Sequence, residues 1–130
     1  MVLILEDADF IRLELKRKLE ESGYEVLDSA TLEDAYRKLS SLRDKIKVVI
    51  IDIKVPTTSG SKFVDGLEMF KSLDPDLRRH YNAIILSGNI NSGQLIKKGS
   101  QIGINDFIAK PYSYGRVLES IEGVAKWFLQ

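Results

Sequence analysis

The sequence predicts one α/β domain in which helices cover both faces of a parallel sheet. Short aliphatic runs recur along the 130 residues, and amphipathic helical stretches lie between them. Most of these runs are apolar throughout rather than alternating, which is typical of strands buried on both faces. No repeat, low-complexity tract or linker interrupts the pattern, so we expect a single domain over residues 1–130.

Five runs rich in β-branched and aliphatic residues are the predicted strands. They are Val2–Leu5, Tyr24–Leu27, Val48–Ile53, Ala83–Leu86 and Asp106–Ala109. Strands joined by helices run parallel in an open sheet, so their carboxyl ends share one edge. Ligands bind at that edge.

Helices are expected between the strands. The first runs from about Ala8 to Ser22 and stops at Gly23, a residue suited to the left-handed position after a helix. Thr31 with Asp34 three residues later resembles a capping box. The apolar stripe that follows is Leu32, Ala35, Leu39 and Leu42.

The second half of the chain has a weaker helical pattern. Ser113 is expected to cap a last helix whose stripe is Val117, Ile121, Val124 and Phe128. The segment Asn91–Gly103 contains three glycines, which predicts a short or mobile element there. Residues Thr57–Asp65 are rich in Ser, Thr and Gly and predict an irregular loop.

Composition excludes several kinds of site. The chain has 19 basic and 19 acidic side chains, no cysteine and one histidine, His80. The lack of cysteine excludes a disulfide framework and a thiolate metal site, and one histidine excludes a multi-histidine metal site. The zero net charge gives no general attraction to nucleic acid or anionic membranes.

Nothing in the sequence predicts a membrane segment or a signal peptide. The apolar runs are too short to span a bilayer, and Glu6 and Asp7 interrupt the first of them. We therefore expect a cytoplasmic protein.

Polar side chains gather where the predicted strands end. They are Glu6 and Asp7 after the first strand, Asp52 in the third, Ser87 and Gly88 after the fourth, and Lys110 and Pro111 after the fifth. Converging carboxylates repel one another and favour a bound cation, and oxygen ligands suit Mg²⁺. A lysine beside them indicates that an anion also binds there. A phosphoryl group fits, because one carboxylate can attack phosphorus in line.

In these motifs the sequence resembles the receiver domains of two-component response regulators, of which the chemotaxis receiver is an example. The matching pieces are VLILED (Val2–Asp7), VVIIDIKVP (Val48–Pro56), AIILSG (Ala83–Gly88) and DFIAKP (Asp106–Pro111). The resemblance implies a doubly wound, flavodoxin-like sheet of order 2-1-3-4-5. It also implies phosphorelay signal transduction, with a sensor histidine kinase or histidine phosphotransfer protein as partner.

The same resemblance implies a role for each acidic residue. Asp52 would accept the phosphoryl group from a phosphohistidine. Asp7 and Asp52 would ligate Mg²⁺ directly, with the backbone carbonyl of Lys54. Glu6 would hold the ion through a water molecule.

The resemblance further implies how the phosphoryl group is held and sensed. Ser87 and the backbone N–H of Gly88 would bind its oxygens, and Lys110 would pair with another. The peptide bond from Lys110 to Pro111 would be cis. Phe107 would turn inward as Ser87 moves, which would change the output face formed by the fourth helix, fifth strand and fifth helix. The domain would catalyse its own phosphorylation and dephosphorylation rather than turnover of a separate substrate.

Three features depart from the family pattern. Glu6 stands where aspartate is commoner. The Lys54 side chain would either attract phosphodonors or obstruct hydrolytic water, so Lys54→Ala is expected to change the lifetime of the aspartyl phosphate. The Thr57–Asp65 segment is longer than usual, and it is either a lid or partner contact over the acceptor or a surface insertion.

Other functions fit the residues less well. A haloacid-dehalogenase-type phosphatase needs a second acid two residues after its nucleophile, where this chain has Lys54. A flavodoxin-like flavin binder needs a Ser/Thr-rich phosphate loop where Glu6 and Asp7 stand. A receiver-like interaction module that is never phosphorylated is the third alternative.

Two remaining motifs have simpler interpretations. We expect His80 to be an exposed loop residue. The segment Trp127–Leu129 is expected to pack in the last helix, to begin a continuation or to form a dimer contact. Neither motif predicts contact with nucleic acid.

Overall fold

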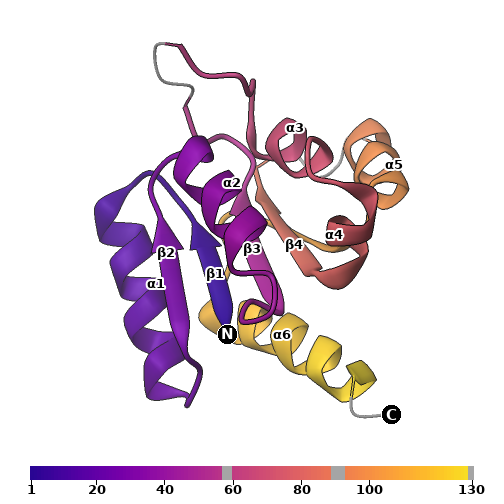
Figure 1. Cartoon of the computed structure of the whole chain (residues 1–130). Coiled ribbons are helices and arrows are strands. Elements are labelled where there is room, and N and C mark those ends of the chain that lie inside the picture. The colour runs from indigo at the N-terminus through magenta and orange to yellow at the C-terminus, as the bar shows by residue number, and fades with distance from the viewer. Residues whose placement is uncertain (57–59, 89–92, 129–130) are drawn as a thin grey trace.

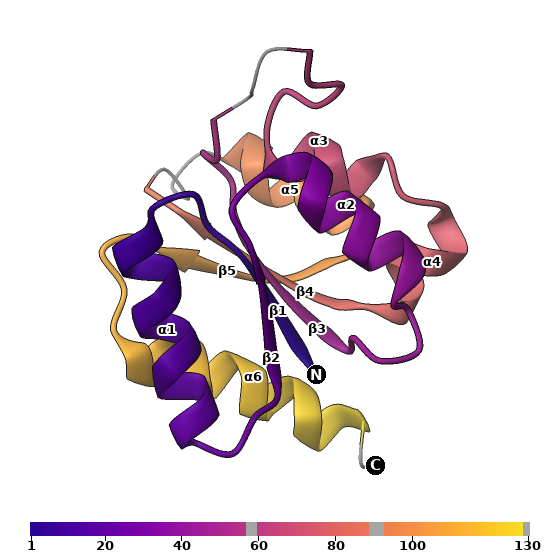
Figure 2. The ribbon, with the colours of Figure 1, turned by 60° about the vertical axis from the view of Figure 1, so that its left-hand side comes forward.

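The computed structural model describes residues 1–56, 60–88 and 93–128, with side chains described as far as residue 123. Its five strands pair in parallel in the order β2-β1-β3-β4-β5 (Figures 1 and 2). They are β1 (Val2–Leu5), β2 (Val26–Ser29), β3 (Val48–Asp52), β4 (Asn82–Ser87) and β5 (Ile104–Ala109). The predicted fold class and strand order are confirmed.

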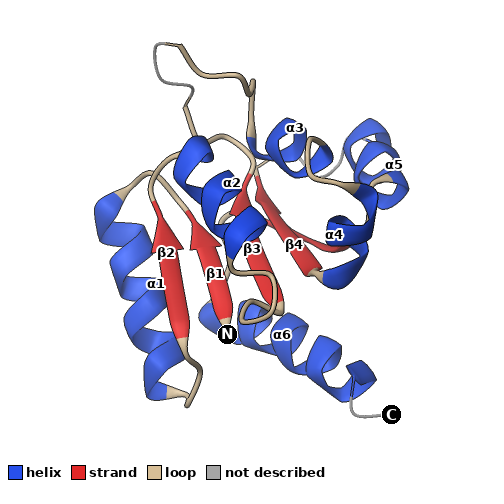
Figure 3. Cartoon of the chain, viewed as in Figure 1, coloured by secondary structure: helices blue, strands red, loops and turns tan. Residues whose placement is uncertain are grey.

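The described residues also form six helices (Figure 3). They are α1 (Asp9–Glu21), α2 (Leu32–Ser41), α3 (Gly66–Lys71), α4 (Pro75–His80), α5 (Gly93–Gln101) and α6 (Tyr114–Phe128). None of the helices in the described ranges is long and apolar enough to cross a membrane.

Helices lie on both faces of the sheet, in three layers (Figure 2). Successive strand residues point to opposite faces. On one face Val2 and Ile4 pack with Leu15 of α1 and Val117 of α6. On the other face the buried residues come from the strands, α2, α3 and α4, with α5 packed at their edge; they include Leu3, Leu5, Leu39, Phe70 and Leu77. The continuous apolar runs of the strands follow from this double burial.

Three strands begin at residues other than those predicted, and one of them, β4, begins one residue early at Asn82. Tyr24 belongs to the turn after α1, because its N–H donates to the carbonyl of Leu19 and Gly23 has a φ of +98°. β5 begins earlier, at Ile104, where the Asn105 side chain accepts the N–H of Ala83 at an irregularity in the ladder. Because the Asn105 side chain takes the place of a backbone hydrogen-bond partner, the apolar pattern that marks a strand is interrupted at the start of β5.

Side chains cap the helices largely as predicted. The hydroxyl of Thr31 accepts the N–H of Asp34 at 3.2 Å, and that of Ser113 accepts the N–H of Arg116 at 3.1 Å. The capping box is only half formed, because the Asp34 carboxylate bonds Ser29 and Lys38 instead.

The prediction for His80 was wrong. His80 ends α4, a short helix capped by Asp74, and its ring lies edge-on to Tyr81 with centroids 5.1 Å apart. The His80 side chain is half-buried, and its Nε2 atom is buried with no hydrogen-bond partner in the described residues.

The described part of the long loop contacts α2. Residues 60–65 form neither helix nor strand, as predicted, and the ring of Phe63 lies 5.1 Å from that of Tyr36. The Ser61 hydroxyl donates to Glu33. Residues 57–59, like the side chains of Trp127–Leu129, lie outside the described residues.

Candidate functional site

The three predicted carboxylates meet at one edge of the sheet. β1 and β3 are paired with Leu5 opposite Ile51, so the residues that follow emerge side by side. One carboxylate oxygen from each of Glu6, Asp7 and Asp52 lies within 4.8 Å of the others. Glu6 and Asp52 are each only 4% exposed, whereas Asp7 is exposed. Three oxygen donors so close together are a ligand set that a small divalent cation prefers.

The crowding of negative charge changes the chemistry of Glu6. Burial, followed by the neighbouring carboxylates of Asp52 and Asp7, raises the pKa of Glu6 to about 7. A bound cation favours the ionised carboxylate and so opposes this effect. The cluster is therefore an electrostatically costly arrangement that a cation would relieve.

Two donors orient the carboxylate of Asp52. The Lys110 ammonium lies 2.8 Å from Oδ2 of Asp52, and the backbone N–H of Lys54 donates to Oδ1 at 3.1 Å. Lys110 reaches the site from the end of β5, where its own N–H donates to the carbonyl of Ser87 at 2.9 Å. The peptide bond from Lys110 to Pro111 is cis, as expected.

The pairing of β3 with β4 determines where Ser87 and Gly88 lie. Asp52 lies opposite Leu86 in the ladder, so Ser87 is the next residue along the site edge. Ser87 is buried and Gly88 is exposed. The four predicted strand ends thus bring a carboxylate cluster, a hydroxyl, a backbone amide and an ammonium to one edge.

Phe107 lies within β5, opposite Ile85 of β4. Its half-buried ring packs against the core under α5. A Cβ atom on Gly99 would lie 2.6 Å from Cζ of this ring, so the glycine makes room for the aromatic side chain.

Lys54 contributes its backbone to the contacts of Asp52, while its side chain is exposed. Gly66, which no sequence pattern singled out, begins α3 against β3. A Cβ there would lie 2.5 Å from Ile51 Cγ2 and 3.0 Å from the carbonyl oxygen of Asp52. The Asp-Gly pair at 65–66 was the available signal, since Asp65 caps the helix and accepts the N–H of Glu68.

Sequence reasoning also missed Tyr112. Burial, then the charges of Glu6 and Asp52, raise the pKa of its phenol. Tyr112, Lys110, Glu6 and Ile11 help to line a groove of about 550 Å³ between α1 and the segment after β5. The groove places apolar surface directly beside the carboxylate cluster.

Comparison with known proteins agrees with this geometry. Residues 2–122 match the response regulator receiver domain family. The chemotaxis protein CheY of Thermotoga maritima is 32% identical over 126 residues, which cover 96% of this chain and 97% of that protein.

Two solved structures with similar folds are each 26% identical to this chain, with TM-scores of 0.80. One is a CheY-like receiver domain protein from Methanospirillum hungatei, matched over 94% of this chain and 90% of that one. The other is the CheX–CheY–BeF₃–Mg²⁺ complex from Borrelia burgdorferi, matched over 95% and 87%.

Proposed function

This chain belongs to the family of response regulator receiver domains, the switches of two-component signalling, and we propose that Asp52 is its phosphoacceptor. The observation that carries the proposal is the position of Asp52 between the carboxylates of Glu6 and Asp7 and the Lys110 ammonium. A buried carboxylate flanked in this way suits transfer of a group that is itself anionic.

In the proposed transfer, a carboxylate oxygen of Asp52 attacks the phosphorus of a phosphohistidine in line. The P–N bond breaks as the P–O bond forms, and the imidazole leaves with the electron pair. Lys110 neutralises charge on the phosphoryl oxygens. The Ser87 hydroxyl and the Gly88 N–H donate hydrogen bonds to them.

The donor set fits Mg²⁺, because three carboxylate oxygens lie within 4.8 Å of one another. Asp7 and Asp52 would hold the ion with the carbonyl of Lys54, and Glu6 would hold it through water. When bound, the ion would offset the negative charge of the phosphoryl group. The similar CheY in the Borrelia complex, which contains BeF₃ and Mg²⁺, supports this assignment.

Phosphorylation would act as a switch by changing the partners of Lys110 and Ser87. The added phosphoryl group carries about −1.5 to −2 charges. Contacts that only the phosphorylated state can make would favour a second arrangement of Ser87 and Phe107. The output face would comprise α5, β5 and α6, which correspond to the predicted fourth helix, fifth strand and fifth helix. An output domain or protein, or a second copy of the chain, would bind there.

A protein phosphodonor has an apolar surface to contact beside the site. Phe10, Ile11 and Leu13 of α1 are 80%, 43% and 52% exposed, and α1 starts two residues after Asp7. Exposed apolar side chains grouped on one helix are typical of a binding surface. We assign this surface to the sensor kinase or histidine phosphotransfer protein, and we place the reaction in the cytoplasm.

The proposal makes the domain a self-modifying switch without a separate substrate. A haloacid-dehalogenase-type phosphatase would need an acid at position 54, where the chain has an exposed lysine. A receiver that is never phosphorylated is the remaining alternative, and the following experiment distinguishes it.

The test is incubation with acetyl phosphate and Mg²⁺, followed by intact-mass measurement. The wild-type protein should gain the mass of one phosphoryl group, and removal of Mg²⁺ with EDTA should prevent the gain. Asp52→Asn should not react, whereas Asp76→Asn, which changes an exposed aspartate of α4, should react normally. No gain in the wild type, or a gain that survives in Asp52→Asn, would contradict the proposal.

A further inference from the structure

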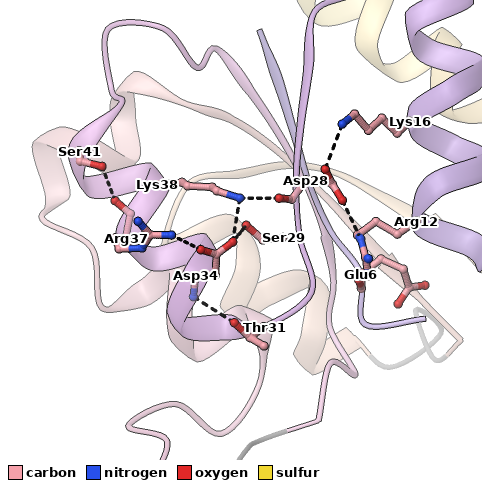
Figure 4. A network of polar contacts seen from close by, with 10 residues as sticks. All are labelled: Glu6, Arg12, Lys16, Asp28, Ser29, Thr31, Asp34, Arg37, Lys38 and Ser41. Carbon is pink, nitrogen blue, oxygen red and sulfur yellow. Dashed lines mark hydrogen bonds and ion pairs between the residues drawn. The ribbon is translucent and has the colours of Figure 1, made fainter. Parts of the chain in front are cut away.

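Arg12 lies on the buried side of α1 and connects the acidic cluster to the edge of the sheet. Its residue is only 9% exposed. One terminal nitrogen donates to the carbonyl oxygen of Glu6 at 2.9 Å, and Nε donates to Asp28 Oδ2 at 2.7 Å (Figure 4). The other terminal nitrogen donates to Asp9 at 2.7 Å. The planar guanidinium thus binds three separate acceptors at once.

The carbonyl that Arg12 binds belongs to the peptide between Glu6 and Asp7. Because that peptide is planar, fixing its oxygen limits rotation of the backbone on either side. The side chains of Glu6 and Asp7 leave the chain at those two positions. The turn is otherwise held by the Glu6 N–H, which donates to Ser29 at 3.1 Å, and by a 3.4 Å contact from the Ala8 N–H to the Glu6 carboxylate.

Asp28, the partner of Arg12 on β2, is itself held in place by further contacts. Its carboxylate also accepts from Lys16 at 3.3 Å, and its carbonyl accepts from Lys38 of α2 at 2.6 Å (Figure 4). Burial opposes ionisation of Asp28, but Arg12 and Lys16 outweigh it and lower its pKa. The Asp28 carboxylate is therefore an ionised partner on β2, and Arg12 links the turn to it.

We propose that Arg12 is a positioning residue for the cation site, which it serves by fixing the peptide between Glu6 and Asp7 against Asp28. The inference rests on the proposed function, because it concerns the cation that assists phosphorylation. Groups behind the ligands of a metal orient them, and their loss typically weakens metal binding about 10- to 100-fold.

The test compares Mg²⁺ affinity by calorimetric titration of the unphosphorylated protein. Arg12→Met should bind Mg²⁺ about tenfold more weakly. The Mg²⁺ affinity of Arg12→Lys should lie between those of Arg12→Met and the wild type. A lysine ammonium keeps the positive charge but lacks the planar set of donors with which the guanidinium binds several acceptors. Without Mg²⁺, amide hydrogen exchange at residues 6–8 should be faster in Arg12→Met. With acetyl phosphate, saturating Mg²⁺ should restore most of its phosphorylation rate.

The matched control is Lys38→Met, which removes a cation from the same strand residue without touching the turn. It should keep wild-type Mg²⁺ affinity. If Arg12→Met does not fold, Asp28→Asn, which weakens the same anchor, is expected to show a smaller loss of affinity in the same direction.

Wild-type affinity in folded Arg12→Met, or in Asp28→Asn where it stands in, would overturn the inference. An equal loss in Lys38→Met would overturn it too. Both outcomes would leave the proposed function intact. A wild-type protein that binds no Mg²⁺ and is not phosphorylated would instead overturn the proposed function and the inference together.

Discussion

Glu6 and Asp52 are buried side by side, yet each has different neighbours. Asp52 faces the ammonium of Lys110 at 2.8 Å, whereas Glu6 faces the carboxylates of Asp52 and Asp7. A buried carboxylate without a cation is costly, which explains why the pKa of Glu6 rises to about 7. The neighbours of each buried carboxylate therefore determine how strongly that carboxylate attracts a positive charge.

Lys110 is the cation that offsets this charge in the protein without a metal ion. We expect Lys110→Met to lower the free energy of unfolding in EDTA by about 1–3 kcal/mol, because Asp52 stays buried without its partner. Mg²⁺ should recover most of the loss. Urea denaturation with and without Mg²⁺ measures both effects, with Lys54→Met as the control. An equal loss under both conditions would contradict this role of Lys110.

Asp34 should make stability depend on acid pH. Burial opposes its ionisation, but hydrogen bonds from Lys38, Ser29 and Arg37 outweigh it and lower the pKa of Asp34 from 3.8 to about 2. A lowered carboxyl pKa stabilises the fold above the unfolded value, and this contribution disappears as pH falls through the folded value. The contribution should therefore be complete at neutral pH and about half lost by about pH 3.

The test is urea denaturation of Asp34→Asn beside the wild type. Allowing for partial exposure of Asp34, the variant should be less stable by about 1–2 kcal/mol at neutral pH and by about half of that at about pH 3. Glu20→Gln, at an exposed position of α1, should show neither effect. A difference that does not change with pH would contradict the assignment.

At the scale of elements, α5 and β5 meet where Gly99 lies against Phe107. A Cβ at Gly99 would lie 2.6 Å from the ring, so Gly99→Ala should force the ring or the helix to move. We expect a loss of about 1–3 kcal/mol in the free energy of unfolding, as overpacking usually gives.

The matched control is Gly123→Ala in α6, where a Cβ would meet nothing within 4 Å. That change should stabilise the helix by up to about 1 kcal/mol. Urea denaturation compares the two variants. If Gly99→Ala were as stable as Gly123→Ala, the close packing of α5 on Phe107 would be wrong.

Element bounds show where sequence patterns reach their limit. The aliphatic run Val2–Leu5 predicted β1 to the residue, and the capping residues Thr31 and Ser113 predicted the starts of α2 and α6. They did not predict α4 or the start of β5 at Ile104. α4 has six residues and one buried side chain, too few for a helical stripe.

At the scale of the whole molecule, the sheet order explains why separate strand ends form one site. The central strands β1, β3 and β4 bring Glu6, Asp52 and Ser87 to neighbouring positions, and β5 adds Lys110. These residues could be predicted because each lies at the end of a recognisable strand or directly after it. Arg12 and Tyr112 could not, because their importance depends on contacts across elements that no local pattern encodes.

The chain has equal numbers of basic and acidic residues, 19 of each, but its charge is unevenly distributed, because three carboxylates meet at the site. Phosphorylation of Asp52 would make the whole molecule negative and would place the new charge beside the carboxylates of Glu6 and Asp7. The response should therefore be concentrated at the residues that meet the phosphoryl group, and it should depend strongly on Mg²⁺.

The most direct test of the central claim is to locate the modified carboxylate. The protein is treated with acetyl phosphate and Mg²⁺ and then reduced with borohydride, which converts an acyl phosphate into an alcohol. Tandem mass spectrometry then identifies the altered residue. We predict homoserine at position 52 and unchanged Glu6 and Asp7. Reduction at Glu6 or Asp7, or no reduced residue at all, would contradict the assignment of Asp52 as the phosphoacceptor.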